Sequence, residues 1–173
     1  MFLQLIAIGY LLIILFENPS PWLSSAILSI MLMAASWIAI RPVRHKVGYL
    51  FPTIFALFVA VGFHLLLSLI FVLGITQWYS PSILIPLAGM YFANTMNTIS
   101  LAAERHSAEL AQHQSQQQAC LTAFHGAMIP QINGLLAVGL VALPGMMTGQ
   151  ILSGVSPLIA VRYQVMIMAM ILG

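Results

Sequence analysis

The chain has 173 residues, of which 61% are hydrophobic and only 5% are charged. A soluble domain carries about 25% charged residues, so this composition excludes a water-soluble globule and predicts a surface that faces lipid. The formal net charge is only +2, and the basic excess sits in one short segment, which indicates membrane topology rather than nucleic-acid binding. The single cysteine excludes an internal disulfide and a metal site built from several cysteines.

Apolar segments in chain order predict an all-α, polytopic transmembrane bundle with about five to six membrane segments. Residues 2–16 form a short segment that Glu17-Asn-Pro-Ser-Pro21 ends, because two prolines in three residues cannot continue a helix. Residues 22–40 are uncharged and long enough to cross. The next segment, Arg41-Pro-Val-Arg-His-Lys46, holds three of the five Lys and Arg residues, so the positive-inside rule places it in the cytoplasm.

Four more membrane segments are expected within one domain that covers residues 1–173. The turn Gln77-Trp-Tyr-Ser-Pro81 between the first two of them is expected outside the cell, and the last segment is too short to cross by itself. These segments are residues 49–73, 83–103, 128–147 and 161–172.

No glycine or proline interrupts the run from Met90 to Phe124. At 1.5 Å per residue this run would extend about 50 Å, which exceeds the hydrocarbon thickness of about 30 Å. We therefore predict one long continuous helix that leaves the membrane near Glu104, with residues 104–127 in the cytoplasm. The polar, glutamine-rich stretch from Glu104 to Gln118 is either a solvated helix face or a docking surface for a soluble partner.

Polar side chains within the predicted spans form two candidate groups. Asn94 and Asn97 lie three residues apart and share a helix face, while Gln131 and Asn133 follow Pro130. One interpretation is hydrogen bonding between helices, worth about 0.6 kcal/mol per bond on average. The other is a polar lining for a substrate path, because polar residues within spans usually face the bundle or a wet cavity. The two groups would face each other if the two spans pack antiparallel.

Metal ligands are not assigned from the sequence. His64 stands alone on an apolar span, which favours a hydrogen-bonded core histidine over a proton relay or a metal ligand. The eleven methionines suggest a soft-metal site, since thioethers suit copper(I). Met166, Met168 and Met170 scatter around a helix at their spacing of two, so packing in the core is favoured.

Enzyme motifs are absent from the sequence. There is no G-x-x-x-x-G-K-[ST], so any ATP is expected to be bound and hydrolysed by another chain. There is also no H-E-x-x-H and no G-x-S-x-G. We therefore expect no enzyme activity, no catalytic residue and no cofactor bound by this chain.

Several segments together are similar to the FetB family, the permease subunits of a bacterial iron-export ABC transporter that are related to plant aluminium-tolerance proteins. The resemblance implies an all-helical ABC permease of the bacterial inner membrane, which forms a homodimer and binds two copies of a separate ATPase. It rests on Gln4-Leu-Ile-Ala-Ile-Gly-Tyr10, Ile85-Pro-Leu-Ala-Gly-Met90 with Asn94, Met128-Ile-Pro-Gln-Ile-Asn133, Val138-Gly-Leu-Val-Ala-Leu-Pro-Gly-Met-Met-Thr-Gly-Gln150 and Tyr163-Gln164.

The chain also departs from that family. It begins after a span that the family has and ends within the last one, so we expect truncation at both ends. The stretch between Gln118 and Met128 is shorter than the family's coupling region. Leu121 and Phe124 lie three apart on one helix face and are the candidate residues for docking the ATPase.

The sequence therefore predicts the membrane-spanning permease subunit of an ATP-driven exporter of iron or another metal ion. The alternatives are a non-transporting structural or regulatory membrane subunit, which would dimerise through Gly145 and Gly149, and a decayed permease fragment.

Overall fold

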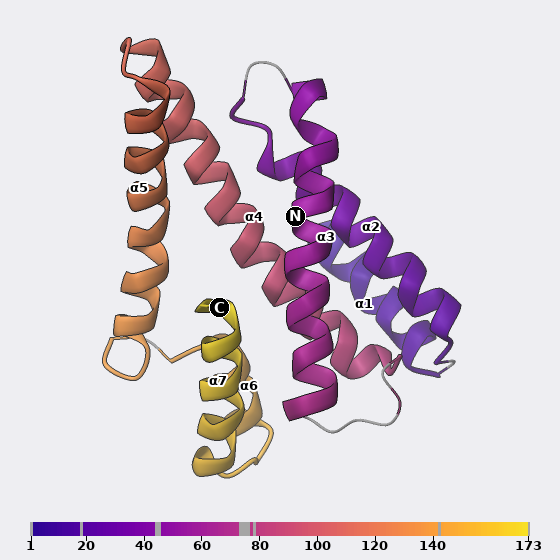
Figure 1. Ribbon diagram of the computed structural model, residues 1–173. Coiled ribbons are helices and arrows are strands. Elements are labelled where there is room, and N and C mark those ends of the chain that lie inside the picture. Colours follow the sequence, from indigo (N-terminus) through magenta and orange to yellow (C-terminus); the bar gives the residue numbers. More distant parts are fainter. Residues whose placement is uncertain are drawn as a thin grey trace. The chain divides into compact units, whose positions relative to one another are not determined.

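The computed structural model describes residues 2–17, 19–43, 46–72, 77, 79–141 and 143–172. The regular elements in these ranges are helices, as the sequence predicts (Figure 1). They are α1 (Phe2–Glu17), α2 (Pro21–Ala39), α3 (Lys46–Leu67), the π-helix η1 (Ser68–Val72), α4 (Pro81–Ala111), α5 (Gln116–Ala137), α6 (Gly145–Leu152) and α7 (Pro157–Leu172).

The chain divides into two compact units, Met1–Met96 and Asn97–Gly173, and the boundary falls within α4. The first unit contains α1, α2, α3, η1 and the beginning of α4. The second contains the remainder of α4 with α5, α6 and α7.

Helix α3 packs against α2 in the first unit and has one buried face and one exposed face. The buried side chains recur every three or four residues, which is the period of one helix face: Thr53, Leu57, Val61, Leu65 and Ser68. The other face exposes large apolar side chains: Phe51, Phe55, Phe58, Phe63 and Leu66. A water-soluble protein rarely exposes an apolar surface of this kind, so this face is suited to lipid.

Two helices in the described part of the chain are long and apolar enough to cross a membrane, Pro21–Ala39 and Gly48–Ile70. Only 22% and 28% of their apolar windows are buried, whereas the core helix of a soluble protein would be mostly buried. The two helices match the predicted spans at residues 22–40 and 49–73. The other predicted spans stay predictions.

The four serines of α2 have their hydroxyl protons in hydrogen bonds. Ser25, Ser29 and Ser36 donate to backbone carbonyls four residues earlier, at 2.8, 2.9 and 2.7 Å. Ser24 instead donates to the carbonyl of Tyr79 at 2.9 Å. Because a membrane offers no water to an unpaired polar group, these bonds make α2 compatible with a lipid environment.

The predicted continuous helix from Met90 to Phe124 is wrong. Helix α4 ends at Ala111, and α5 begins at Gln116. His113 takes a positive φ of 61°, a conformation that histidine adopts more readily than most residues. The Ser115 hydroxyl then caps α5 by accepting from the Gln118 N–H at 3.3 Å. A left-handed residue and a capping serine therefore break the helix without glycine or proline.

The predicted segment at residues 128–147 is also not one helix. Helix α5 continues through Pro130 and ends at Ala137, and Pro144 immediately precedes α6. Proline removes one backbone N–H, a loss that a helix in a membrane protein tolerates. The interruption begins instead at Val138, whose ψ of 126° is extended, and Gly139 follows with a φ of 79° that is unsuited to a helix. Pro144 then starts α6 rather than ending a span.

In the second unit, the end of α4 and helix α5 form a hairpin, in which α5 returns beside the end of α4 (Figure 1). An alanine stripe on α5 is buried at a spacing of four: Ala119, Ala123 and Ala127. Small side chains allow close helix packing, and a Cβ added at Gly126 would lie 3.8 Å from Cγ of Arg105 on α4. Arg105 also pairs with Glu109 one turn later, at 2.8 Å.

Candidate functional site

A polar contact joins α4 and α5 within the second unit. The side-chain amide of Gln131 donates to the hydroxyl of Thr98 at 2.7 Å, and both residues are half-buried. Residue 98 lies before the hairpin turn and residue 131 after it, so the two helices run antiparallel at this contact. The hairpin thus supplies the antiparallel packing that a polar path between these helices requires.

The other predicted path residues occupy different environments. Asn94 is half-buried on the part of α4 that belongs to the first unit, and its amide donates to the carbonyl of Met90 at 2.8 Å. Asn97 and Asn133 are exposed. Asn133 follows Gln131 by two residues, which places it on a different face of α5. A role for these asparagines in a substrate path stays a prediction.

A buried chain of hydrogen bonds lies in the first unit around Ser68 and Tyr91. The Ser68 hydroxyl is 2.7 Å from the carbonyl of His64 and 2.7 Å from the Tyr91 hydroxyl. A carbonyl can only accept, so Ser68 donates its single proton to His64, and Tyr91 must then donate to Ser68. The chain therefore runs from Tyr91 through Ser68 to the backbone of α3.

His64 extends this polar cluster. Its Nδ1 lies 2.7 Å from the carbonyl of Ala60, so Nδ1 carries a proton in this bond. Its ring is half-buried and lies 6.1 Å from the Tyr91 ring, centroid to centroid. The predicted hydrogen bond of His64 is confirmed, although the side chain is half-buried rather than part of the core. In the neutral ring, Nε2 keeps a lone pair that can accept a hydrogen bond.

The π-helix η1 begins at Ser68, where this cluster meets the backbone. Short π-helical turns within α-helices occur frequently at functional sites. The sequence pattern does not single out Ser68 or Tyr91. One signal was present, however, because Ser68 follows His64 by four residues and so shares its helix face. Its partner Tyr91 lies on another helix, so this contact can be identified only from the three-dimensional structure.

The two residues predicted to dock an ATPase are both exposed on α5. Leu121 keeps 56% and Phe124 keeps 60% of its surface exposed, and both lie away from the buried alanine stripe. Exposure of this kind leaves them available to a partner, and their docking role stays a prediction.

An all-helical chain whose long apolar helices expose aromatic and aliphatic faces is a helical membrane protein. This chain belongs to the family described as Uncharacterised protein family (UPF0014), whose sequence model matches residues 1–173. No solved structure matches the chain.

Curated relatives match nearly the whole chain. It is 38% identical to the UPF0014 membrane protein slr1647 of Synechocystis, over 98% of this chain and 72% of that protein. It is 28% identical to the Probable iron export permease protein FetB of Escherichia coli, over 99% of this chain and 71% of that one. It is also 30% identical to Protein ALUMINUM SENSITIVE 3 of Arabidopsis thaliana, over 99% of this chain and 67% of the relative. The predicted family resemblance is confirmed.

Proposed function

We propose that this chain is the membrane-spanning permease subunit of an ATP-driven exporter, and that its cargo is iron or a chemically related metal ion. The observation that carries this proposal is the similarity to the Probable iron export permease protein FetB of Escherichia coli over 99% of the chain. The lipid-compatible helices described above support the membrane part of the assignment.

The energy for transport comes, in this proposal, from a separate ATPase, and the permease works as a homodimer in the bacterial inner membrane. The α4–α5 hairpin is the element that receives the push of the ATPase. Helix α4 has 31 residues and so extends about 46 Å. Asn94 and Tyr91 lie on this same helix, so a displacement of α4 at the hairpin turn can be transmitted along the helix to these two side chains.

The cargo path uses the polar side chains of α4 and α5, namely Asn94, Asn97, Gln131 and Asn133. Amide oxygens can replace water molecules around a passing cation, as backbone carbonyls do in ion channels. The Gln131–Thr98 bond would close the path in the resting state and open when the hairpin tilts.

The test is a complementation experiment. The chain is expressed with a candidate ATPase in an Escherichia coli strain that lacks its own iron export permease, and cellular iron is measured by mass spectrometry after an iron load. We expect lower iron and better growth than with the ATPase alone. A matched control carries an ATPase whose phosphate-binding lysine is replaced by alanine, which should remove the effect.

The same strain distinguishes the structural or regulatory alternative. A transporter subunit must hold its ATPase, so a tagged chain should retain the ATPase through purification. A chain that purifies without any ATPase and leaves cellular iron unchanged would contradict the proposal.

A further inference from the structure

Helices α6 and α7 pack against each other. Together with the end of α5 and the segment that follows it, they line a partly open pocket with a volume of about 450 Å³. Ten residues line it, none of them charged and nine of them apolar or glycine. All of them belong to the second unit. None of the residues assigned to the proposed cargo path or to ATPase docking is among them, so this pocket is separate from the proposed transport function.

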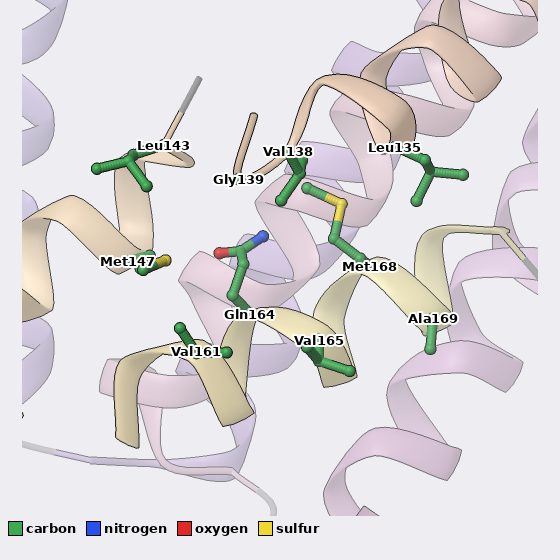
Figure 2. A pocket seen from close by; sticks show the side chains of 10 residues that line it. All are labelled: Leu135, Val138, Gly139, Leu143, Met147, Val161, Gln164, Val165, Met168 and Ala169. Atoms are coloured by element: carbon green, nitrogen blue, oxygen red, sulfur yellow. The ribbon is translucent and has the colours of Figure 1, made fainter. Parts of the chain in front are cut away.

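The one polar side chain that lines the pocket is Gln164. It keeps only 5% of its surface exposed, and Figure 2 shows its carboxamide projecting from α7 toward the other lining side chains. No residue in the described part of the chain forms a hydrogen bond with this carboxamide. An amide that faces an apolar space without a partner costs free energy, so this carboxamide is suited to pair with a molecule that enters the pocket.

The other nine lining residues indicate what kind of molecule fits the remainder of the pocket. Met147 and Met168 come from different helices, and Figure 2 shows their thioethers beside the same space. Methionine side chains are flexible and polarizable, so they adapt to apolar molecules of irregular shape. A lining without charge offers nothing to balance the charge of an ion. The volume lies within the range of about 300–1,000 Å³ that is typical of small-molecule sites.

We propose that this pocket binds a neutral amphiphile dissolved in the bilayer, with an apolar body among the side chains and one hydroxyl group paired with Gln164. A carboxamide can donate to and accept from such a head group. The membrane is the source, because an apolar ligand concentrates there. Gln164 belongs to the Tyr163-Gln164 segment, one of the motifs that the proposed transport function leaves unused.

The test uses the full-length chain in phosphatidylcholine nanodiscs and two photoreactive probes. One is a diazirine-bearing octanol, and the other is the matched octane without the hydroxyl. Adducts are located by peptide mass spectrometry. We expect the octanol to label the pocket residues about fivefold to tenfold more than the octane, which corresponds to one hydrogen bond.

Gln164→Leu should reduce octanol labelling to the level of octane, because leucine fills similar space without an amide. Replacing an amide that faces this apolar pocket should leave the thermal unfolding temperature the same or higher, and Gln164→Met serves if the leucine variant does not fold. Gln117→Leu makes the same change at an exposed position and should keep full labelling. Monoolein added to the bilayer should compete, whereas decane sulfonate should not.

Three outcomes would overturn the proposal. Equal labelling by both probes would show that the head group is not recognised, and adducts outside the pocket would place the site elsewhere. Competition by the sulfonate as strong as that by monoolein would show that the ligand need not be neutral. Cellular iron is not measured in any of these experiments, so their failure is distinct from a failure of the transport assignment.

Discussion

Buried hydroxyl groups make specific contacts between helices that the apolar side chains around them cannot make. Tyr91 and Ser68 join α4 to η1 at 2.7 Å, and both side chains are buried. A hydroxyl whose partner is removed cannot find water within a helix bundle. The Ser68–Tyr91 pair therefore fixes the relative register of the two helices in the first unit.

Tyr91→Phe removes the donor to Ser68 and keeps the ring. We expect a loss of about 1 kcal/mol in the free energy of unfolding, the usual net worth of one hydrogen bond. The measurement is denaturant unfolding of the purified protein in detergent. Tyr49→Phe is the matched control, since Tyr49 is exposed, and it should change stability by much less. A Tyr91→Phe protein as stable as the control would show that the bond contributes nothing.

Asn94 and Asn133 are predicted to matter more to transport than to folding. Asn94→Leu and Asn133→Leu should leave protein levels intact and abolish iron tolerance in the complementation strain, because each removes an amide from the proposed path. Protein levels are read by immunoblot and tolerance by growth. A parallel loss of protein and tolerance would favour hydrogen bonding between helices as the role of these residues.

At the residue level, the sequence identifies polar groups but not their partners. Gln131 is singled out by its place in an apolar segment, yet its contact with Thr98 follows from the hairpin. Similarly, the sequence singles out His64 as a lone histidine in an apolar segment. The contact of Tyr91 with Ser68 becomes apparent only from the packing of α4 against η1. Hydrogen bonds between helices depend on three-dimensional register, which a pattern along one helix does not contain.

At the level of elements, the turn between α4 and α5 depends on His113, whose φ is 61°. A β-branched residue is poorly tolerated there, because its side chain clashes in the left-handed conformation. We expect His113→Val to lower the free energy of unfolding by about 1–2 kcal/mol, while His113→Gly should be close to neutral. His125→Val, at an exposed helical position of α5, is the control for the loss of an imidazole. Equal effects of the two valine variants would contradict this role of the turn.

The docking prediction also belongs to an element, the exposed face of α5. Phe124→Ala should remove binding of a co-expressed ATPase, because burial of such a side chain is worth about 1.5–3 kcal/mol, which is enough for a weak contact only. The measurement is a pull-down with the tagged chain. Phe55→Ala is matched in residue type and in exposure, since Phe55 is 62% exposed on α3, and should keep binding. Tight binding that is independent of Phe124 would show that docking lies elsewhere, for instance on the basic Arg41–Lys46 segment.

In this chain, the sequence predicts which segments are helical more reliably than it predicts where each helix begins and ends. The helices at α2 and α3 follow from uncharged runs of sufficient length. The break at residues 112–115 does not, because Ser115 and His113 carry the signal and neither is a strong helix breaker. Pro130 is the opposite case, because a proline suggests a break where the helix in fact continues. One lost N–H does not end a helix that neighbouring contacts support.

For the whole molecule, the basic segment at Arg41–Lys46 predicts that the α4–α5 turn is cytoplasmic and that Gln77 is external. Gln77→Cys and His113→Cys are made separately in a Cys120→Ser background, because the native cysteine is exposed. An impermeant thiol reagent applied to intact cells should label position 77 and not position 113. Labelling of position 113 alone would reverse the topology.

Composition alone is sufficient for the broad class of the molecule. Very few charged residues and many apolar ones predict a helical membrane protein, and the fold and the family agree with this. The division into two units within α4 is not visible in the sequence, because it depends on which helices pack together and not on the character of any one helix.

The serines of α2 have a consequence for how this helix can move. Three of its four hydroxyls donate within the helix itself, so a rotation of α2 about its own axis breaks none of these three bonds. Among the four serines, Ser24 near the first turn is the one that donates to another segment, through the carbonyl of Tyr79. This hydrogen bond anchors the N-terminal end of α2, whereas its C-terminal end is held by packing, since Ser36 and Ala39 are fully buried. The two ends of the helix therefore resist displacement by different means.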